Sequence, residues 1–235
     1  MHLWDDDANR RLIANALPSF LPIYDGFESH IKRVDAVRYA YMYIFGGVYM
    51  DLDFTCLRSL DAMALAPGTV TLGYQLANRN DREAVANAFM AAPPRHPFFK
   101  RVLEEIPRAQ RATRRTHPTE VTGGLFLTAL VREWQARGLP GLQVLPIPLV
   151  YTSAWNAPKF ACGTGRTRPP RLRELELDRC AARLNRSAVT TFWTHSWLDQ
   201  WKADKRRRSL RWPHSERPTS NSSASRAPRL LEYSG

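Results

Sequence analysis

The sequence has 235 residues, of which 44% are hydrophobic, which excludes wholesale disorder and suits one domain with a buried core. Its formal net charge is +12, so the chain attracts polyanions: nucleic acid, an anionic membrane surface or a phosphorylated substrate. Charge alone does not choose among these partners.

Two helices are predicted near the start of the chain. Residues 8–17 form a short helix that stops before Pro18. Residues 28–45 form a longer one, and Gly46 and Gly47 end it because glycine takes the left-handed C-cap conformation without a steric penalty. Apolar positions of the longer helix recur at spacings of three and four and predict one buried stripe: Ile31, Val34, Val37, Tyr41 and Ile44.

A strand with two different faces is predicted at residues 48–54. One face is apolar and is expected to pack on the core: Val48, Met50, Leu52 and Phe54. The other face carries Tyr49, Asp51 and Asp53. Because the apolar face already places this strand against a core, the polar face needs a separate explanation.

The middle of the chain alternates strands and helices. We expect strands at 70–76 and 142–150, the second at a sheet edge because prolines interrupt it. Helices are expected at 81–91, 98–106 and 125–137, with a turn at 122–124 before the last of them.

The last third of the chain changes in composition. Residues 163–186 are rich in arginine and predict a surface excursion with a short helix, and residues 189–198 form a last apolar segment. From about residue 202, basic residues and then Ser, Thr and Pro dominate. We therefore expect an α/β domain over residues 1–200 and a basic, Ser/Pro-rich disordered tail over residues 201–235.

The cysteines and the apolar runs limit other functions. Cys56, Cys162 and Cys180 lack CxxC spacing, which disfavours a zinc site; a Cys162–Cys180 disulfide and three free thiols both stay open. No apolar run reaches the ~18–20 residues that span a bilayer, and residues 1–7 are not typical of a signal peptide. We expect no anchor or signal in this chain.

The acidic pair of the predicted strand indicates a metal site. On a strand, Asp51 and Asp53 would project from the same face about 6–7 Å apart, at a rise of ~3.3 Å per residue. Two carboxylates that close are costly to ionise unless a cation lies nearby. Mg²⁺ and Mn²⁺ prefer oxygen ligands, often carboxylates together with substrate phosphates, which fits a diphosphate leaving group. A solvated strand end is the alternative interpretation of this short motif.

The preceding helix carries a second polar pair. Asp35 and Arg38 are three residues apart and so share a face. The Gly46–Gly47 break would fold helix and strand back to back and bring that face to Asp51 and Asp53. A surface ion pair is the alternative, although it does not explain why the pair lies in an otherwise apolar helix.

Residues 31–61 resemble the DXD-containing core of glycosyltransferase family 32, which includes fungal α-1,6-mannosyltransferases and mannosyl-inositol-phosphoceramide synthases. The family pattern is Asp, Arg three residues later, Gly-Gly, Tyr and then DxD, and this chain matches it at Asp35, Arg38, Gly46, Gly47, Tyr49, Asp51 and Asp53. Weaker likeness extends to residues 87–99, 119–130, 144–151 and 194–197. Together the likeness covers roughly residues 1–200 and leaves the tail unmatched.

The resemblance implies a GT-A fold, a Rossmann-like α/β fold, and sugar transfer with retention of configuration. In the family a first strand precedes the part that resembles residues 1–4, so this chain is expected to lack that strand.

The resemblance also implies roles for single residues. Asp35 and Arg38 would hold the donor sugar, with Tyr49 and Asn87 at the substrate. Asp51 would bind hydroxyls and assist the metal. The remaining expected site residues are Asp53 and His195 as metal ligands, and Ser196 and Trp197 over the diphosphate.

Structural roles are the alternative for some of these residues: a hydrogen-bonded core histidine at His195, simple packing at Trp197, and a turn cap at Asn87.

The implied cofactor is Mn²⁺ or Mg²⁺, and the implied partners are a nucleotide sugar (GDP-mannose or a UDP-sugar) and a glycan or glycolipid acceptor. An anionic membrane surface is a further expected partner, and the family implies a membrane-associated Golgi location. Two other functions compete: a truncated, non-catalytic nucleotide-sugar-binding or scaffolding homologue, and a basic nucleic-acid-binding protein. No nucleic-acid-binding motif accompanies the arginines, so no nucleic acid partner is expected.

Overall fold

The structure of the chain is a computed structural model. It describes residues 4–63, 65–76, 78–112, 117–147, 149–151, 182, 184–191 and 202. Except for residue 202, the predicted tail lies outside these residues, as do both distal cysteines and most of the 163–186 excursion.

The N-terminal part is helical, as predicted. It consists of α1 (Asp6–Ala16), a 3₁₀ turn η1 (Pro18–Phe20), α2 (Leu21–Asp25) and α3 (His30–Ile44). Asp5 caps α1, because its carboxylate accepts a hydrogen bond from the Ala8 N–H at 2.7 Å. The two predicted helices at 8–17 and 28–45 are confirmed, with ends that differ by one or two residues.

A mixed four-stranded sheet forms the centre of the described part, in the order β1-β4-β3-β5. Its strands are β1 (Gly47–Met50), β4 (Val85–Ala92), β3 (Val70–Tyr74) and β5 (Leu142–Leu145). β4 pairs antiparallel with both β1 and β3, whereas β5 pairs parallel with β3 at the sheet edge. β2 (Phe54–Cys56) and β6 (Val189–Thr191) make a separate antiparallel pair. A short 3₁₀ turn, η2 (Leu60–Met63), follows β2.

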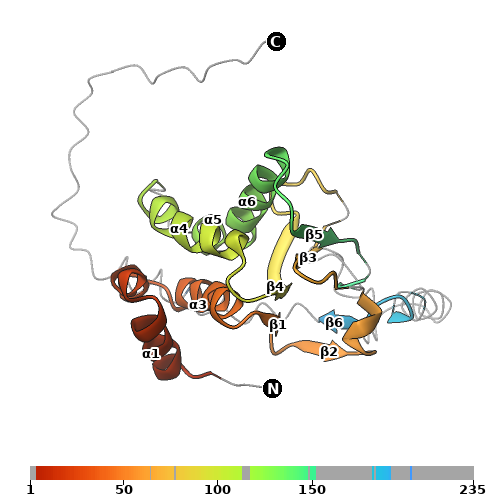
Figure 1. The fold of residues 1–235 in the computed structure, drawn as a ribbon, viewed down its shortest axis with the longest axis horizontal. Coiled ribbons are helices and arrows are strands. Elements are labelled where there is room, and N and C mark those ends of the chain that lie inside the picture. The colour runs from red at the N-terminus through yellow and green to blue at the C-terminus, as the bar shows by residue number, and fades with distance from the viewer. Residues whose placement is uncertain are drawn as a thin grey trace, which may run out of the picture.

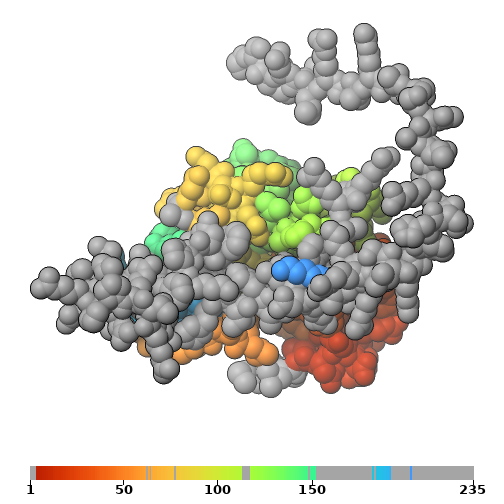
Figure 2. All heavy atoms as spheres, turned by 180° about the vertical axis from the view of Figure 1, so that it is seen from behind, coloured from red at the N-terminus to blue at the C-terminus, as the bar shows by residue number. Residues whose placement is uncertain are grey.

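The helices gather on one side of this sheet (Figure 1). Besides α3, they are α4 (Pro97–Ala112), α5 (Pro118–Val121) and α6 (Gly124–Ala136). The view from behind shows red and orange atoms of the N-terminal elements in the lower part of the surface, and yellow and green atoms of later elements above them (Figure 2). Of the described helices, none is long and apolar enough to cross a membrane.

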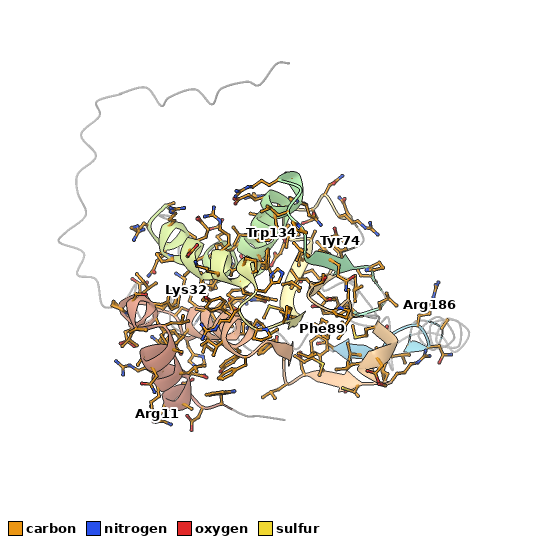
Figure 3. The ribbon with its side chains drawn as sticks, in the orientation of Figure 1. Arg11, Lys32, Tyr74, Phe89, Trp134 and Arg186 are labelled. Atoms are coloured by element: carbon orange, nitrogen blue, oxygen red, sulfur yellow. The ribbon has the colours of Figure 1, made fainter. Side chains whose placement is uncertain are left out.

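Two apolar clusters hold the sheet between them. The larger joins the helices to the sheet and includes Val37, Met42, Leu72, Val85, Met90, Phe98, Leu127 and Trp134. The smaller includes Met63, Ala86, Phe89, Val150, Tyr151 and Val189. Figure 3 labels one member of each, Trp134 on α6 and Phe89 on β4. Burial on both faces explains why β4 is apolar along nearly its whole length.

Three expectations from the sequence are wrong. Residues 81–91 do not form a helix, because β4 occupies most of that range at the centre of the sheet. The predicted stripe of α3 is only partly buried, since Asp35, Arg38 and Met42 are more buried than Ile31 or Val34.

The third error concerns residues 48–54, which form two strands and not one. β1 ends at Met50 and β2 begins at Phe54, so Asp51 and Asp53 lie in the turn between them. The Phe54 N–H donates to the Asp51 carbonyl at 3.1 Å and closes this turn. The predicted core face is also wrong, because Leu52 is 88% exposed and Val48 is 40% exposed.

Candidate active site

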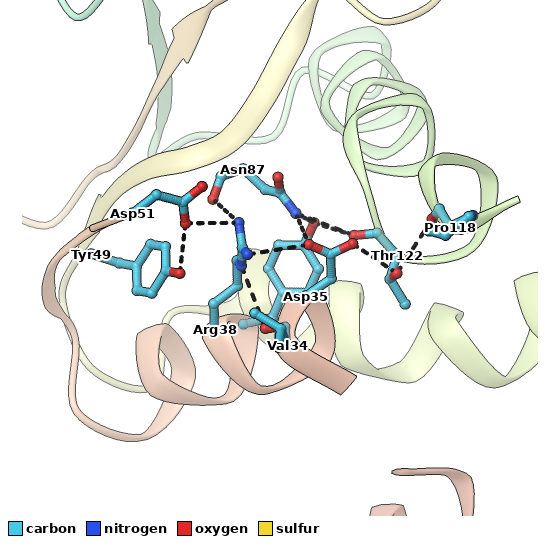
Figure 4. A network of polar contacts seen from close by, with 9 residues as sticks. Val34, Asp35, Arg38, Tyr49, Asp51, Asn87, Pro118 and Thr122 are labelled. Carbon is cyan, nitrogen blue, oxygen red and sulfur yellow. Dashed lines mark hydrogen bonds and ion pairs between the residues drawn. The ribbon is translucent and has the colours of Figure 1, made fainter. Parts of the chain in front are cut away.

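Helix α3 carries a buried ion pair at the centre of the site (Figure 4). Asp35 and Arg38 are one turn apart, and the Arg38 Nη2 atom lies 3.4 Å from the Asp35 Oδ1 atom. Each residue is only 5% exposed. The surface ion pair considered from the sequence is therefore excluded, and the shared helix face is confirmed.

Hydrogen bonds from two distant elements hold the Asp35 carboxylate. The Asn87 side-chain amide of β4 donates to Oδ1 at 2.9 Å, and the Thr122 hydroxyl after α5 donates to Oδ2 at 3.0 Å. Burial raises the pKa of Asp35, while Arg38 and these two hydrogen bonds oppose that rise. The carboxylate is thus locked in place by the three groups around it.

Arg38 connects Asp35 to the turn between β1 and β2. This turn carries Asp51 and Asp53 and is called the acidic turn below. Its Nη1 atom lies 3.2 Å from Asp51 Oδ1 and also donates to the Asn87 carbonyl at 3.2 Å. Burial alone lowers the pKa of Arg38, but the Asp51 and Asp35 carboxylates and Tyr49 raise it by more, so the side chain stays charged. A permanent cation is therefore fixed between two carboxylates.

Tyr49 completes the wall beside this cation. Its ring centroid lies 5.1 Å from the Arg38 guanidinium carbon, a cation–π contact, and its hydroxyl donates to Asp51 Oδ1 at 2.7 Å. Burial, opposed by Arg38 and reinforced by Asp51, raises the pKa of Tyr49, so the hydroxyl keeps its proton. Asp51 is consequently held by Arg38 and Tyr49 through one of its two carboxylate oxygens.

The two glycines after α3 allow β1 to run close to α3, so that Asp51 can reach Arg38. Gly46 and Gly47 have φ angles of +64° and +83°, as the predicted C-cap requires. A Cβ atom at position 46 would lie 2.5 Å from the Pro94 backbone nitrogen. Because the chain reverses so tightly there, β1 returns alongside α3 and brings Asp51 to Arg38.

A bulge in β4 directs two backbone carbonyl groups toward the site. β4 pairs with β3 through Ala86 opposite Gly73 and then resumes at Met90 opposite Leu72, so Asn87–Phe89 are extra relative to β3. The carbonyl of Asn87 accepts from Arg38, and that of Ala88 accepts from the Asp51 N–H at 3.0 Å. The bulge therefore turns the main chain of β4 toward the acidic turn.

Three residues of the site were missed by the sequence interpretation. Thr122 is fully buried under Asp35, and the Tyr39 hydroxyl donates to the Thr122 carbonyl at 2.6 Å while receiving a bond from the Asn87 amide. Tyr39 stands four residues after Asp35, so helical spacing already put it on the same face. Tyr151 is also buried, and burial together with the nearby Asp51 and Asp53 carboxylates raises its pKa.

The other predicted site residues have mixed outcomes. Asn87 joins the network through its side-chain amide and its carbonyl, whereas its expected role at the substrate stays a prediction. Asp53 is partly exposed in the turn. His195, Ser196 and Trp197 lie outside the described residues, so their roles stay predictions.

The acidic turn suits a metal ion that takes further ligands from a substrate. Among the described residues, no three His, Cys, Asp or Glu side chains come together as a complete protein site. The side chain of Asp51 is 32% exposed. Asp53, two residues later, is only partly buried. Hard carboxylate oxygens with access to solvent fit Mg²⁺ or Mn²⁺, which commonly use one or two carboxylates plus phosphate oxygens.

Comparisons with known proteins bear on this site. Residues 1–69, which contain Asp35, Arg38 and both turn aspartates, match the family described as the glycosyltransferase sugar-binding region containing a DXD motif.

Curated relatives extend the match along the chain. Inositol phosphoceramide mannosyltransferase 3 of Schizosaccharomyces pombe is 32% identical over 162 residues, covering 66% of this chain and 43% of that protein. Inositol phosphoceramide mannosyltransferase 2 of the same yeast is 35% identical over 104 residues, 44% of this chain and 28% of its own length. Mannosyl phosphorylinositol ceramide synthase SUR1 of Saccharomyces cerevisiae is 30% identical over 140 residues, 59% of this chain and 35% of its own length.

The chain thus spans less than half the length of these relatives. The matched residues still include the whole Asp35–Arg38–Asp51 network, in agreement with the resemblance of residues 31–61. Residues 1–69 of this chain therefore belong to the glycosyltransferase sugar-binding region that contains a DXD motif.

Proposed function

We propose that this protein is a metal-dependent, retaining glycosyltransferase with a GT-A fold. It would transfer a hexose such as mannose or galactose from GDP-mannose or a UDP-sugar to a glycan or glycolipid. The observation that carries the proposal is the buried Arg38 cation, which fixes Asp51 at the mouth of an acidic turn.

The site residues divide the work between positioning and binding. Asp53 would ligate Mn²⁺ or Mg²⁺, with Asp51 beside it and His195 as a further ligand from the family resemblance. The metal, when bound, would neutralise the charge that develops on the diphosphate as it leaves. Arg38 and Tyr49 hold Asp51 in one orientation, so the ligand is pre-arranged before a substrate arrives.

Asp35 and Arg38 are almost fully buried. We propose that they contact the donor sugar only on the side of the site where Asp51 lies. Because the Asp35 carboxylate already accepts bonds from Asn87 and Thr122, its main contribution is to orient Arg38. Ser196 and Trp197 keep their proposed place over the diphosphate.

The acceptor is proposed from the relatives and from charge. The relatives are named as an inositol phosphoceramide mannosyltransferase and a mannosyl phosphorylinositol ceramide synthase, and both names contain a phosphate group, which is anionic. A chain with a net charge of +12 suits an anionic acceptor and an anionic membrane surface. A membrane-associated Golgi location is part of this proposal, and it is supported by the family resemblance alone.

Isothermal titration calorimetry on the full chain tests the donor and the metal. GDP-mannose and UDP-glucose are titrated with Mn²⁺ and with EDTA, on the wild type and on Asp53→Asn. We expect one donor to bind only with Mn²⁺, and Asp53→Asn to lose that binding. Asp7→Asn, which removes the same charge from an exposed position on α1, is the control and should bind normally.

Absence of Mn²⁺-dependent binding to any nucleotide sugar would refute the proposal. Metal-dependent binding without hydrolysis or transfer, across a panel of glycan and lipid acceptors, would favour the non-catalytic homologue instead.

A further inference from the structure

A second polar pocket lies between the β3–β4 connection and helix α6. It encloses about 170 Å³ and is lined mainly by polar side chains: Tyr74, Arg79, Asn80, Thr128, Arg132 and Gln135. Tyr74, at the end of β3 and labelled in Figure 3, packs against the same apolar cluster that contains Trp134 of α6. We call it the Arg79–Arg132 pocket.

Its rim carries two guanidinium groups. The Arg79 guanidinium carbon lies 5.1 Å from the centroid of the Tyr74 ring. Arg132 Nη2 donates to the carbonyls of Arg79 at 3.0 Å and Asp81 at 2.6 Å, which fastens the β3–β4 connection to α6. Both arginines are exposed, so a ligand reaches them without rearrangement of the core.

The lining is positively charged and its floor is apolar. Of the described residues that line the pocket, none is acidic. The nearby Asp81 carboxylate accepts the Glu83 N–H at 3.0 Å, so it is engaged within its own turn. The floor is formed by the buried side chains of Val85 and Val131. Planar guanidinium groups bind phosphate through paired hydrogen bonds, and the apolar floor provides a surface against which an attached ring could pack.

The pocket and the acidic turn lie at the same end of the sheet. Asp51 contacts β4 at Ala88, and Tyr74 pairs with β4 at Val85. These two positions on β4 are three residues apart and include part of the bulge. The acidic turn and the pocket therefore flank the same end of β4, one beside β1 and the other beside β3.

We infer that the Arg79–Arg132 pocket is the acceptor subsite, where the two arginines bind a phosphate carried by the acceptor. Asn80 and Gln135, which are both exposed, offer hydrogen bonds to hydroxyl groups of the attached ring, and Tyr74 offers a flat wall. The assignment of this pocket to the acceptor rests on the proposed function. The phosphate-binding chemistry itself rests only on the pocket.

Binding of myo-inositol 1-phosphate to the full chain tests the inference. Calorimetric titrations compare this probe with inorganic phosphate and with myo-inositol, for the wild type, Arg79→Gln and Arg82→Gln. Arg82 is an exposed arginine in the same turn that does not line the pocket, so its replacement is the matched control. We expect Arg79→Gln to bind the probe at least about tenfold more weakly, and Arg82→Gln to bind like the wild type.

Equal losses in the two variants would overturn the inference, because they would indicate general charge attraction. Inorganic phosphate binding as tightly as the probe would also overturn it, since the attached ring would then contribute nothing. Flotation with phosphatidylinositol or phosphatidylcholine vesicles separates the two sources of phosphate: Arg79-dependent binding to the former alone assigns the site to a lipid headgroup. Binding of the soluble probe without such flotation assigns it to a soluble phosphorylated acceptor.

The same samples separate this inference from the proposed function. Failure of Mn²⁺-dependent donor binding overturns the transferase, whereas failure of Arg79-dependent probe binding overturns the subsite.

Discussion

Replacing Arg38 by methionine tests the architecture of the site most directly. Methionine keeps much of the side-chain length but removes the charge, so Asp35 stays buried with only hydrogen-bond donors around it. Removing one partner of a buried ion pair typically costs about 3–5 kcal/mol, because the other charge is left uncompensated. We expect Arg38→Met to lower the free energy of unfolding by about that amount at pH 7.

Urea denaturation followed by tryptophan fluorescence measures this loss. Arg10→Met is the matched control, because Arg10 pairs with Asp25 at 2.7 Å on an exposed surface. Exposed ion pairs contribute little, so the control should unfold close to the wild type. The double variant Asp35→Asn/Arg38→Met should recover part of the loss, since it removes both buried charges.

The loss of stability in Arg38→Met should also depend on pH. Burial raises the pKa of folded Asp35, and Arg38 partly offsets the rise. Without Arg38 the folded pKa rises further, so the stability that Asp35 contributes is present at low pH and is lost as pH increases through the folded pKa. The deficit of Arg38→Met should thus be larger at pH 8 than at pH 5. A variant as stable as Arg10→Met, or a deficit that grows toward low pH, would refute the reasoning.

Three further predictions concern groups around the sheet. The Phe98 N–H, which is the first N–H of α4 because Pro97 has none, donates to His96 Nδ1 at 3.1 Å, and burial lowers the pKa of His96. The stability that His96 contributes should therefore fall as pH drops below about 6.5, and His96→Asn should flatten the pH profile of the melting temperature. Gly73→Ala should cost about 1–3 kcal/mol in urea denaturation, because the new Cβ would lie 2.7 Å from the Tyr151 ring; unchanged stability would contradict this contact. Thr122→Val keeps the shape but removes the bond to Asp35, and should cost about 1–3 kcal/mol by the same measurement, with Thr122→Ser retaining most of the wild-type stability.

Local spacing was enough to predict the first half of the site. Asp35 and Arg38 share a helix face because they are three residues apart, and the glycines at 46 and 47 reverse the chain because they tolerate positive φ. These contacts depend on short stretches of sequence, so the pattern contains the information needed to place them.

Long-range pairing explains the errors. Residues 81–91 are rich in alanine and favour a helix by propensity, yet β4 forms there because β1 and β3 flank it and both of its faces are buried. Small side chains at Ala86 and Ala91 erase the alternation that would have identified a strand.

Alternation also failed where the chain turns. Leu52 continues the apolar pattern of Val48 and Met50, but it projects into solvent from the turn between β1 and β2. Thr122 was missed for a related reason, since it is 87 residues from Asp35 in the sequence and no periodic pattern joins them.

The bulge in β4 has a consequence for how this protein tolerates change. The contacts that Asn87 and Ala88 make to Arg38 and Asp51 use carbonyl oxygens, which every amino acid carries. Variation in side-chain identity at Ala88 is therefore compatible with these contacts, provided that the replacement remains small. Loss or gain of a single residue between Ala86 and Met90 would instead displace every carbonyl after it, so this segment should accept substitutions far more readily than insertions or deletions.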